Sequence, residues 1–271
     1  MSKVLTDAQI EHWRRAGALW PIDLLSPAEA DHYYQRFKEL ENSIGGEAQE
    51  RFRIKAHLPF PWLWDLVTKP KLADIVEDLI GPDIVCWGSS FFTKKAHDPR
   101  FISWHQDSTY YGLEPPESST AWVAVTEANS KAGCMKIIPG SHTGPSILPH
   151  DETYDSNNLL VRGQTIRDVD ETSATEMPLK PGQISIHHNK TIHSSEPNAA
   201  DWPRVGYAIH FAASNVRQAQ FKNALAIHIR GNDPEGNWLE DPRPEYEMSP
   251  ESLQAVDDYY ERYKTAMKAQ K

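Results

Sequence analysis

The sequence predicts a mainly β protein with flanking helices. Short runs rich in β-branched and aromatic residues, bounded by Gly, Pro, Asn and Asp, fill the middle of the chain, and such runs are typical of a sandwich or barrel. Capped helical patterns occupy both ends. No helical pattern alternates with the β runs, which argues against a parallel βαβ sheet. With 271 residues and no internal repeat, we expect a single domain over residues 1–271.

The first part of the chain, residues 1–82, is expected to be helical. Thr6 and Ser26 are predicted N-caps, because each is followed three positions on by the Gln or Glu that completes a capping box. Gly17 is the expected end of the first helix. Pro70 separates two shorter helices in "FPWLWDLVTKPKLADIVEDLIGP".

The β core is expected over residues 83–215, with strands in "DIVCWGSSFFTKK", "STAWVAVTEA", "GCMKIIPG", "GQISIHH" and "RVGYAIHFAAS". Residues 144–180 are polar and weakly periodic, which predicts a long loop and a candidate lid over a functional site. A capped helix is expected over residues 249–268, where the aromatic stripe "YYERYK" is a candidate surface for a homodimer.

Composition narrows the class of protein. A net charge of −10 argues against nucleic acid as a partner, because phosphate contacts need a surplus of Lys and Arg. No apolar run approaches the ~20 residues of a membrane span, and the amino terminus lacks a signal-peptide pattern. Cys86 and Cys134 have no CxxC spacing, which favours a reducing compartment and leaves one disulfide open as an alternative. We expect a soluble, cytoplasmic protein.

The stretch "WHQDSTYY" suggests a metal site. His105 and Asp107 are two positions apart and can face the same way at the end of a strand. His193 follows on a turn-rich stretch, and Arg204 lies eleven positions later. Two histidines and one carboxylate on one face of an octahedron are the ligands of non-haem iron oxygenases. The planar guanidinium of an arginine suits a dicarboxylate. The alternative is a set of unrelated polar loop residues, with Arg204 in a strand-end salt bridge.

With these residues the chain resembles the phytanoyl-CoA dioxygenase family of Fe(II)- and 2-oxoglutarate-dependent oxygenases. "WHQD", "AWVAVTEANSKAGCMKIIPGSH" and "PGQISIHH…IHSSEPN…R" follow the family order over about residues 91–211, and "FPWLWDLV" extends the likeness over most of the chain. The resemblance implies a double-stranded β-helix (jelly roll, cupin-like). It also implies Fe(II) as cofactor, with 2-oxoglutarate and O2 as co-substrates.

The resemblance further implies the roles of individual residues. The implied iron ligands and catalytic residues are His105, Asp107 and His193. The implied co-substrate contacts are Arg204 and Ser195, the pocket-lining Trp122, and the looser matches Lys55 and Ser90. Because related halogenases lack the carboxylate ligand, the presence of Asp107 favours hydroxylation. From the residues alone, Ser195 can also be a turn former and Trp122 a core residue.

The expected reaction is hydroxylation of an unactivated C–H bond with release of succinate and CO2. Tyr110 and Tyr111 are candidates for the substrate wall. Strand alternation turns only one of His187 and His188 inward, and the family register favours His188. No basic cluster suggests a coenzyme A site, so a small polar metabolite, such as an amino acid derivative or aminophosphonate, is the expected substrate. The alternatives are a cupin-like metalloenzyme without 2-oxoglutarate and a catalytically silent binding module.

Overall fold

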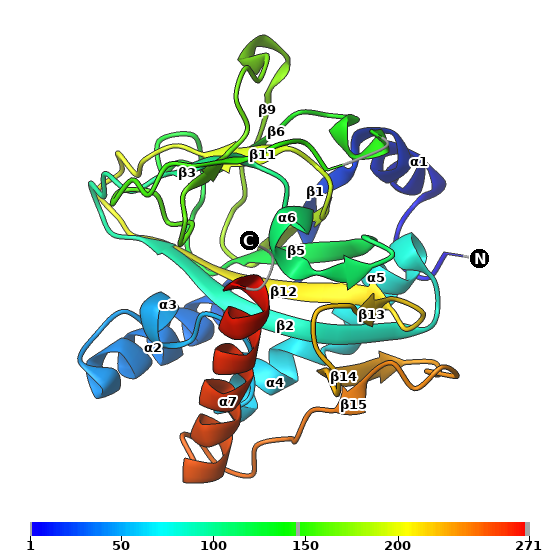
Figure 1. The fold of residues 1–271 in the computed structure, drawn as a ribbon. Helices are drawn as coiled ribbons and strands as arrows, with labels where there is room; N and C mark the ends of the chain where they lie inside the picture. Colours follow the sequence, from blue (N-terminus) through cyan, green and yellow to red (C-terminus); the bar gives the residue numbers. More distant parts are fainter. Residues whose placement is uncertain (1, 145–146, 269–271) are drawn as a thin grey trace.

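The computed structural model describes residues 2–144 and 147–268 (Figure 1). Seven strands form a large sheet in the order β1 (Ala18–Asp23), β10 (Gln183–His188), β5 (Ser118–Ala124), β12 (Arg204–Ala213), β2 (Ile84–Lys94), β14 (Leu225–Arg230) and β15 (Leu239–Glu240). All neighbours are antiparallel except the pair β14 and β15. The expected strands of the β core are therefore confirmed.

A second sheet lies over the large one. Its four strands are, in order, β3 (Ile102–His105), β11 (His193–Ser195), β6 (Met135–Ile137) and β9 (Thr175–Met177). Figure 1 shows this sheet above β12, β5 and β2, with α2 (Pro27–Ile44), α3 (Ala48–Arg51) and α4 (Pro61–Val67) on the opposite face of the large sheet. Helix α7 (Pro250–Lys268) rises in front of the large sheet to the level of β12. The architecture is the predicted jelly roll with flanking helices.

The helix ends follow the predicted capping signals. Thr6 and Ser26 make complete capping boxes at the start of α1 (Asp7–Ala16) and α2, and Gly17 ends α1 in the left-handed conformation. Helix α5 (Pro70–Ile80) begins at the predicted proline. At the start of α7 the Ser252 amide donates to the Ser249 hydroxyl over 3.1 Å. Cys86 and Cys134 are free and buried, so the alternative of a disulfide between them is wrong.

The N-terminal part is not wholly helical. Strand β1 follows α1 directly and pairs with β10 at the edge of the large sheet, from Ala18 opposite His187 to Asp23 opposite Gln183. Pro21 lies where this register slips, between Leu19 and Ile22. A proline is tolerated there because an edge strand can bulge and leave one side unpaired.

The segment of residues 144–180 is more ordered than a plain loop; its residues 145–146 lie outside the described part of the chain. It holds the short strands β7 (Asp151–Glu152) and β8 (Gln164–Thr165) as well as β9. Backbone amides of Leu159 and Ile166 donate to carbonyls of Phe101 and Trp104, beside β3. The segment therefore packs next to the predicted metal ligands, and its role as a lid stays a prediction.

The tail helix uses its aromatic stripe within the chain. Tyr259 is buried, and the Tyr263 hydroxyl donates to the Tyr110 carbonyl over 2.9 Å. The homodimer prediction thus loses the surface on which it depended. No helix among residues 2–144 and 147–268 has the length and apolar character that crossing a bilayer requires.

Strand β12 shows how the fold positions a site. Its first nine residues are buried, because the helices cover one face of the sheet and the second sheet covers the other. Alternation sends Val205, Tyr207 and Ile209 into the main core under the helices. The intervening Arg204, Ala208 and His210 point into a cavity between the two sheets.

Candidate active site

A cavity of about 500 Å³ lies between the two sheets. Its walls are mostly apolar and aromatic, with polar side chains at a few points. Three sets of residues matter for its chemistry: the predicted metal ligands, the predicted co-substrate contacts, and the aromatic residues around them.

Backbone pairing brings the predicted metal ligands together. His105 ends β3 and His193 begins β11, and the two residues lie directly opposite each other in the antiparallel pair. Asp107 follows at the start of the short helix α6 (Ser108–Tyr111). The carboxylate Oδ1 lies 3.4 Å from Nε2 of His105 and 3.8 Å from Nε2 of His193. One ligand atom from each residue lies within 4.8 Å of the other two.

Hydrogen bonds orient both imidazoles for ligation. Nδ1 of His105 lies 2.9 Å from the Ser103 carbonyl, and Nδ1 of His193 lies 2.9 Å from the Thr191 carbonyl. A carbonyl only accepts, so Nδ1 carries the proton in each ring and Nε2 keeps its lone pair. Such bonds fix the tautomer of metal-binding histidines. The donor set therefore fits a divalent first-row metal, and it is the only such group among the residues that the structure describes.

The charges of the cluster also suit a metal. Burial raises the pKa of Asp107, but the neighbouring imidazoles of His193, His105 and His187 outweigh it and hold that pKa well below its usual value. Burial, with repulsion from His105, holds the pKa of His193 well below its usual value. At neutral pH Asp107 is thus a carboxylate and His193 a neutral imidazole, which are the forms that bind metals.

A buried cation lines the same cavity. Arg204 is 3% exposed; its Nη1 donates to the Gly133 carbonyl over 2.5 Å, and its Nε has no hydrogen-bond partner in the described part of the chain. The guanidinium lies over the Trp122 ring, 5.5 Å from its centroid. Burial lowers the pKa of Arg204 to about 10, so it remains charged at neutral pH. No described carboxylate lies within 4 Å to neutralise it, since Arg204 forms no ion pair.

Most of the other predicted site residues line the cavity. Those that line the cavity with the metal ligands and Arg204 are Ser195, Trp122, Ser90, Tyr110 and Tyr111. Ser195 lies two residues along β11 from His193, a step of about 7 Å in an extended strand. The structure thus brings these residues together, and their roles in binding stay predictions.

Two predicted site residues lie elsewhere. Lys55 is fully buried away from the cavity, where its Nζ donates to the Asp241 carboxylate over 2.6 Å; an internal ion partner takes it out of the site. His188 faces the outer side of β10 and contacts Glu117 over 2.8 Å. The inward residue is His187, whose Nε2 lies 3.2 Å from Oδ2 of Asp107.

Several cavity residues were not predicted from the sequence, among them His187, His210 and Trp87. His187 was detectable, because Ile184 and Ile186 mark one face of β10 as apolar and place residue 187 on the other. His210 and Trp87 stack on each other with ring centroids 5.0 Å apart. No local spacing singles out these two residues, since they come from neighbouring strands far apart in the sequence.

The fold and this cluster together define a jelly-roll protein with a site of the 2-His-1-carboxylate type. Residues 13–206 match the family described as Phytanoyl-CoA dioxygenase (PhyH), and the chain belongs to that family.

Two curated relatives illustrate the range of the family. Peroxisomal phytanoyl-CoA dioxygenase of Bos taurus is 28% identical over 158 residues, which are 56% of this chain and 47% of the relative. A probable alpha-ketoglutarate-dependent hypophosphite dioxygenase of Stutzerimonas stutzeri is 28% identical over 163 residues, 59% of this chain and 56% of the relative. The chain spans about half the length of these relatives.

Solved structures match nearly the whole chain. The non-heme monooxygenase ThoJ without ligand has a TM-score of 0.83 at 29% identity, covering 96% of this chain and 98% of its own. Its nickel complex has a TM-score of 0.79 at 27% identity and covers 96% and 99%. CytC3 with Fe(II) and alpha-ketoglutarate has a TM-score of 0.68 at 21% identity, covering 92% and 98%, and supports the fold alone.

Proposed function

We propose that this protein is an Fe(II)- and 2-oxoglutarate-dependent oxygenase that hydroxylates an unactivated C–H bond of a small metabolite, with release of succinate and CO2. One observation carries the proposal: the buried guanidinium of Arg204 has no anionic partner in the described part of the chain, yet it lines the cavity that holds His105, Asp107 and His193. Leaving a buried charge unpaired is costly, so a ligand is expected to supply the missing carboxylate.

The site residues divide the work as follows. His105, Asp107 and His193 would hold Fe(II), and Arg204 with Ser195 would hold the distal carboxylate of 2-oxoglutarate. Bound iron would supply the redox chemistry that couples oxidation of 2-oxoglutarate by O2 to hydroxylation of the substrate. Two similar proteins support this proposal: one relative is named a probable alpha-ketoglutarate-dependent dioxygenase, and a structural neighbour is named a non-heme monooxygenase.

The chain also prepares its metal ligands. Oδ2 of Asp107 faces His187 at 3.2 Å and accepts from the Thr120 hydroxyl at 3.4 Å, which leaves Oδ1 turned toward His105 and His193. A carboxylate held this way is a single-oxygen ligand in a fixed orientation. Because the carboxylate position is filled by Asp107, we propose hydroxylation rather than halogenation.

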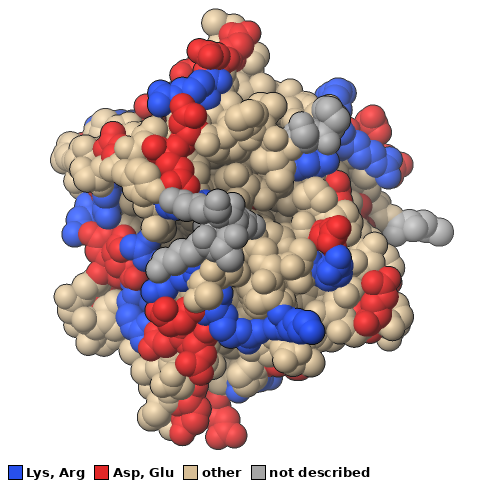
Figure 2. Space-filling model, in the orientation of Figure 1, with Lys and Arg blue, Asp and Glu red and all other residues tan. Residues whose placement is uncertain are grey.

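The residues that line the cavity indicate the chemical character of the expected substrate. Tyr110, Tyr111, Trp87, Tyr260 and Tyr263 line the cavity around α6 and α7, so the substrate is expected to carry an apolar or ring-containing body. The buried Trp87 indole N–H has no partner among the residues that the structure describes, which favours a substrate with a hydrogen-bond acceptor. Basic and acidic side chains lie next to one another on the face shown in Figure 2, in keeping with a small molecule rather than a coenzyme A thioester.

The test is succinate release from 2-oxoglutarate by the iron-loaded protein, with O2 uptake screened over small metabolites. Replacing Arg204 by Met is expected to lower kcat/KM for 2-oxoglutarate by about a hundredfold or more, since a charge-assisted bidentate contact is lost. Arg217→Met is the matched control, because that arginine is exposed and pairs with Glu114.

Each alternative predicts a different result. A cupin-like metalloenzyme without 2-oxoglutarate would turn over equally well with Arg204→Met. A catalytically silent binding module would bind iron yet release no succinate with any candidate substrate, and that result would reject the proposal. The expected cytoplasmic location is tested separately, by fractionation of cells that express the chain.

A further inference from the structure

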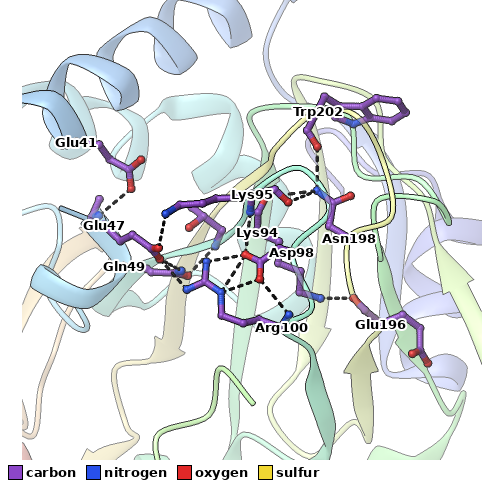
Figure 3. A network of polar contacts seen from close by, with 12 residues as sticks. Glu41, Glu47, Gln49, Lys94, Lys95, Asp98, Arg100, Glu196, Asn198 and Trp202 are labelled. Atoms are coloured by element: carbon purple, nitrogen blue, oxygen red, sulfur yellow. Dashed lines mark hydrogen bonds and ion pairs between the residues drawn. The ribbon is translucent and has the colours of Figure 1, made fainter. Parts of the chain in front are cut away.

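A second buried base lies beside Arg204. Lys94 is opposite Arg204 in the pairing of β2 with β12, and it is fully buried. Its Nζ donates to the Ser195 hydroxyl over 2.8 Å, to the Ser195 carbonyl over 3.3 Å and to the Glu196 carbonyl. Figure 3 shows the lysine nitrogen directed at the Glu196 carbonyl. No carboxylate of the described ranges pairs with Lys94, so it resembles Arg204 in lacking an anion.

The end of β2 holds the connection between β11 and β12, whose two ends carry Ser195 and Arg204. The Asn198 amide nitrogen donates to the Lys95 and Trp202 carbonyls, each over 2.8 Å, and to the Lys94 carbonyl over 3.4 Å (Figure 3). This clamp fixes residues 196–203 against the backbone of Lys94. The end of β2 at Lys94 therefore positions both residues that are predicted to contact the carboxylate, Ser195 and Arg204.

The segment after Lys94 is fixed as well. Arg100 binds the Asp98 carboxylate with Nε at 2.9 Å and Nη2 at 2.6 Å, and its Nη1 binds Glu47 at 2.7 Å (Figure 3). Because the Lys94 Nζ is buried and bonded to the Ser195 hydroxyl and to the Ser195 and Glu196 carbonyls, it has little freedom to point elsewhere. The direction of its hydrogen bond to Ser195 is thus a property of the fold.

That bond decides which way the Ser195 hydroxyl donates. Its oxygen already accepts from Lys94, and no acceptor for its own proton lies within reach in residues 2–144 and 147–268. Ser195 lines the cavity together with Arg204. A carboxylate at Arg204 would supply the missing acceptor. With no anion supplied by the described residues, burial and repulsion from Arg204 lower the pKa of Lys94 to about 5. A carboxylate bound at Arg204 would raise that pKa and favour the ammonium form, which can only donate.

We infer that Lys94 is a positioning residue for the distal carboxylate of a 2-oxo dicarboxylate. It turns the Ser195 hydroxyl into a donor toward the anion bound by Arg204, and it adds positive potential behind that hydroxyl. The inference depends on the proposed function, because it assumes that the anion in the cavity is the co-substrate. Burying a lysine without a counterion lowers the stability of the fold, and the proposed role accounts for why Lys94 is buried here.

The test compares two ligands that differ in the distal carboxylate alone. Calorimetry on the nickel-loaded protein gives Kd for 2-oxoglutarate and for 2-oxovalerate, which has the same chain length without that carboxylate. Lys94→Met is expected to weaken 2-oxoglutarate by about tenfold, the size of a lost charge-assisted hydrogen bond, and to leave 2-oxovalerate unchanged. Lys95→Met is the matched control, since that side chain is 70% exposed and pairs with Glu47.

The outcomes separate this inference from the proposed function. Equal Kd changes for both ligands would show a merely structural lysine and overturn the inference. Unchanged 2-oxoglutarate binding in Lys94→Met would also overturn it. If that variant does not fold, Ser195→Ala replaces it and is expected to lose the preference for 2-oxoglutarate; retention of the preference refutes the inference. If the wild-type protein does not bind 2-oxoglutarate, the proposed function fails with it.

Discussion

Two buried clusters combine histidine with aspartate, and they differ in one respect. On the helix side of the large sheet, Asp241 lies 2.6 Å from the Lys55 ammonium and 3.1 Å from His57. That closed cluster (Lys55, His57 and Asp241) contains its own cation. All three of its side chains are completely buried and none lines the cavity.

Between the sheets, the close side-chain partners of Asp107 are the imidazoles of His105, His187 and His193 and the Thr120 hydroxyl. Together with His105 and His193, Asp107 forms the open cluster, which faces the cavity and contains no lysine or arginine. Lys94 and Arg204 show the opposite deficiency, since they are buried basic side chains that pair with no carboxylate among the described residues. The comparison teaches that buried charge alone does not mark a functional site; buried charge that the chain leaves unbalanced does.

The strongest test of the open cluster removes its carboxylate. Asp107→Ala is expected to lower metal-dependent succinate release by more than a hundredfold, since losing even an outer partner of a ligand costs about 10- to 100-fold in affinity or activity. Excess nickel is expected to stabilise the wild-type protein by about 2.7 kcal/mol at a hundred times its Kd, and the variant not at all. Unfolding curves with and without nickel measure this.

Asp151→Ala is the control for that experiment, because Asp151 is exposed and pairs with Arg167 at the surface. It is expected to keep both the turnover and the nickel effect. If nickel stabilised Asp107→Ala as much as it stabilises the wild-type protein, the open cluster would not be a metal site that depends on Asp107.

The closed cluster is tested by its stability. Asp241→Asn leaves Lys55 buried without its counterion and is expected to lower the free energy of unfolding by about 3–5 kcal/mol. Asp257→Asn breaks an exposed pair with Arg51 and is expected to cost about 1 kcal/mol or less. Urea unfolding of the metal-free proteins gives both values.

Asp107→Asn measures how much the stability of the fold depends on the carboxylate of the open cluster. No lysine or arginine of the described residues pairs with Asp107, so its neutral variant is expected to change the stability of the metal-free protein by no more than about 1 kcal/mol. A loss as large as that of Asp241→Asn would contradict the view that only one of the two clusters is balanced.

Sequence reasoning succeeded where local chemistry determines the structure. The capping boxes at Thr6 and Ser26 were predictable because both partners lie within one helical turn. The strands and the approach of His105, Asp107 and His193 were predicted from alternation, spacing and the family resemblance.

It failed where a partner lies far along the chain. Nothing around Lys55 announces Asp241, which is 186 positions away. Lys94 stands next to Lys95 at a strand end, and only the sheet register decides that the first is buried and the second exposed. Strand β1 was missed because Pro21 interrupts a short strand that only the edge of the sheet accommodates.

His210 lies between the two clusters and gives the comparison a pH test. Burial, with repulsion from His187 and His57 and despite attraction by Asp107, lowers its pKa from 6.5 to about 4. The unfolded chain therefore binds a proton that the folded protein refuses between these values, so stability is lost as pH falls from 6.5 to 4. The loss from this residue is about 3 kcal/mol.

Replacing His210 by Asn is expected to flatten that part of the pH dependence of unfolding. NMR titration of the His210 ring gives its pKa directly. A ring that titrates at 6.5 in the folded protein would show that water reaches the base of the cavity, and the open cluster would then be less isolated than its burial indicates.

A glycine lies at the cation end of the cavity. A Cβ on Gly206 would lie 1.8 Å from Cζ2 of Trp122, so Gly206→Ala must displace the indole that lies against Arg204. We expect about tenfold weaker binding of 2-oxoglutarate and a stability loss of about 1–3 kcal/mol. Gly46→Ala, which meets nothing within 4 Å, is the control. If Gly206→Ala binds 2-oxoglutarate as the wild type does, then Trp122 does not shape the anion site, and the guanidinium of Arg204 would have to be oriented by the Gly133 carbonyl alone.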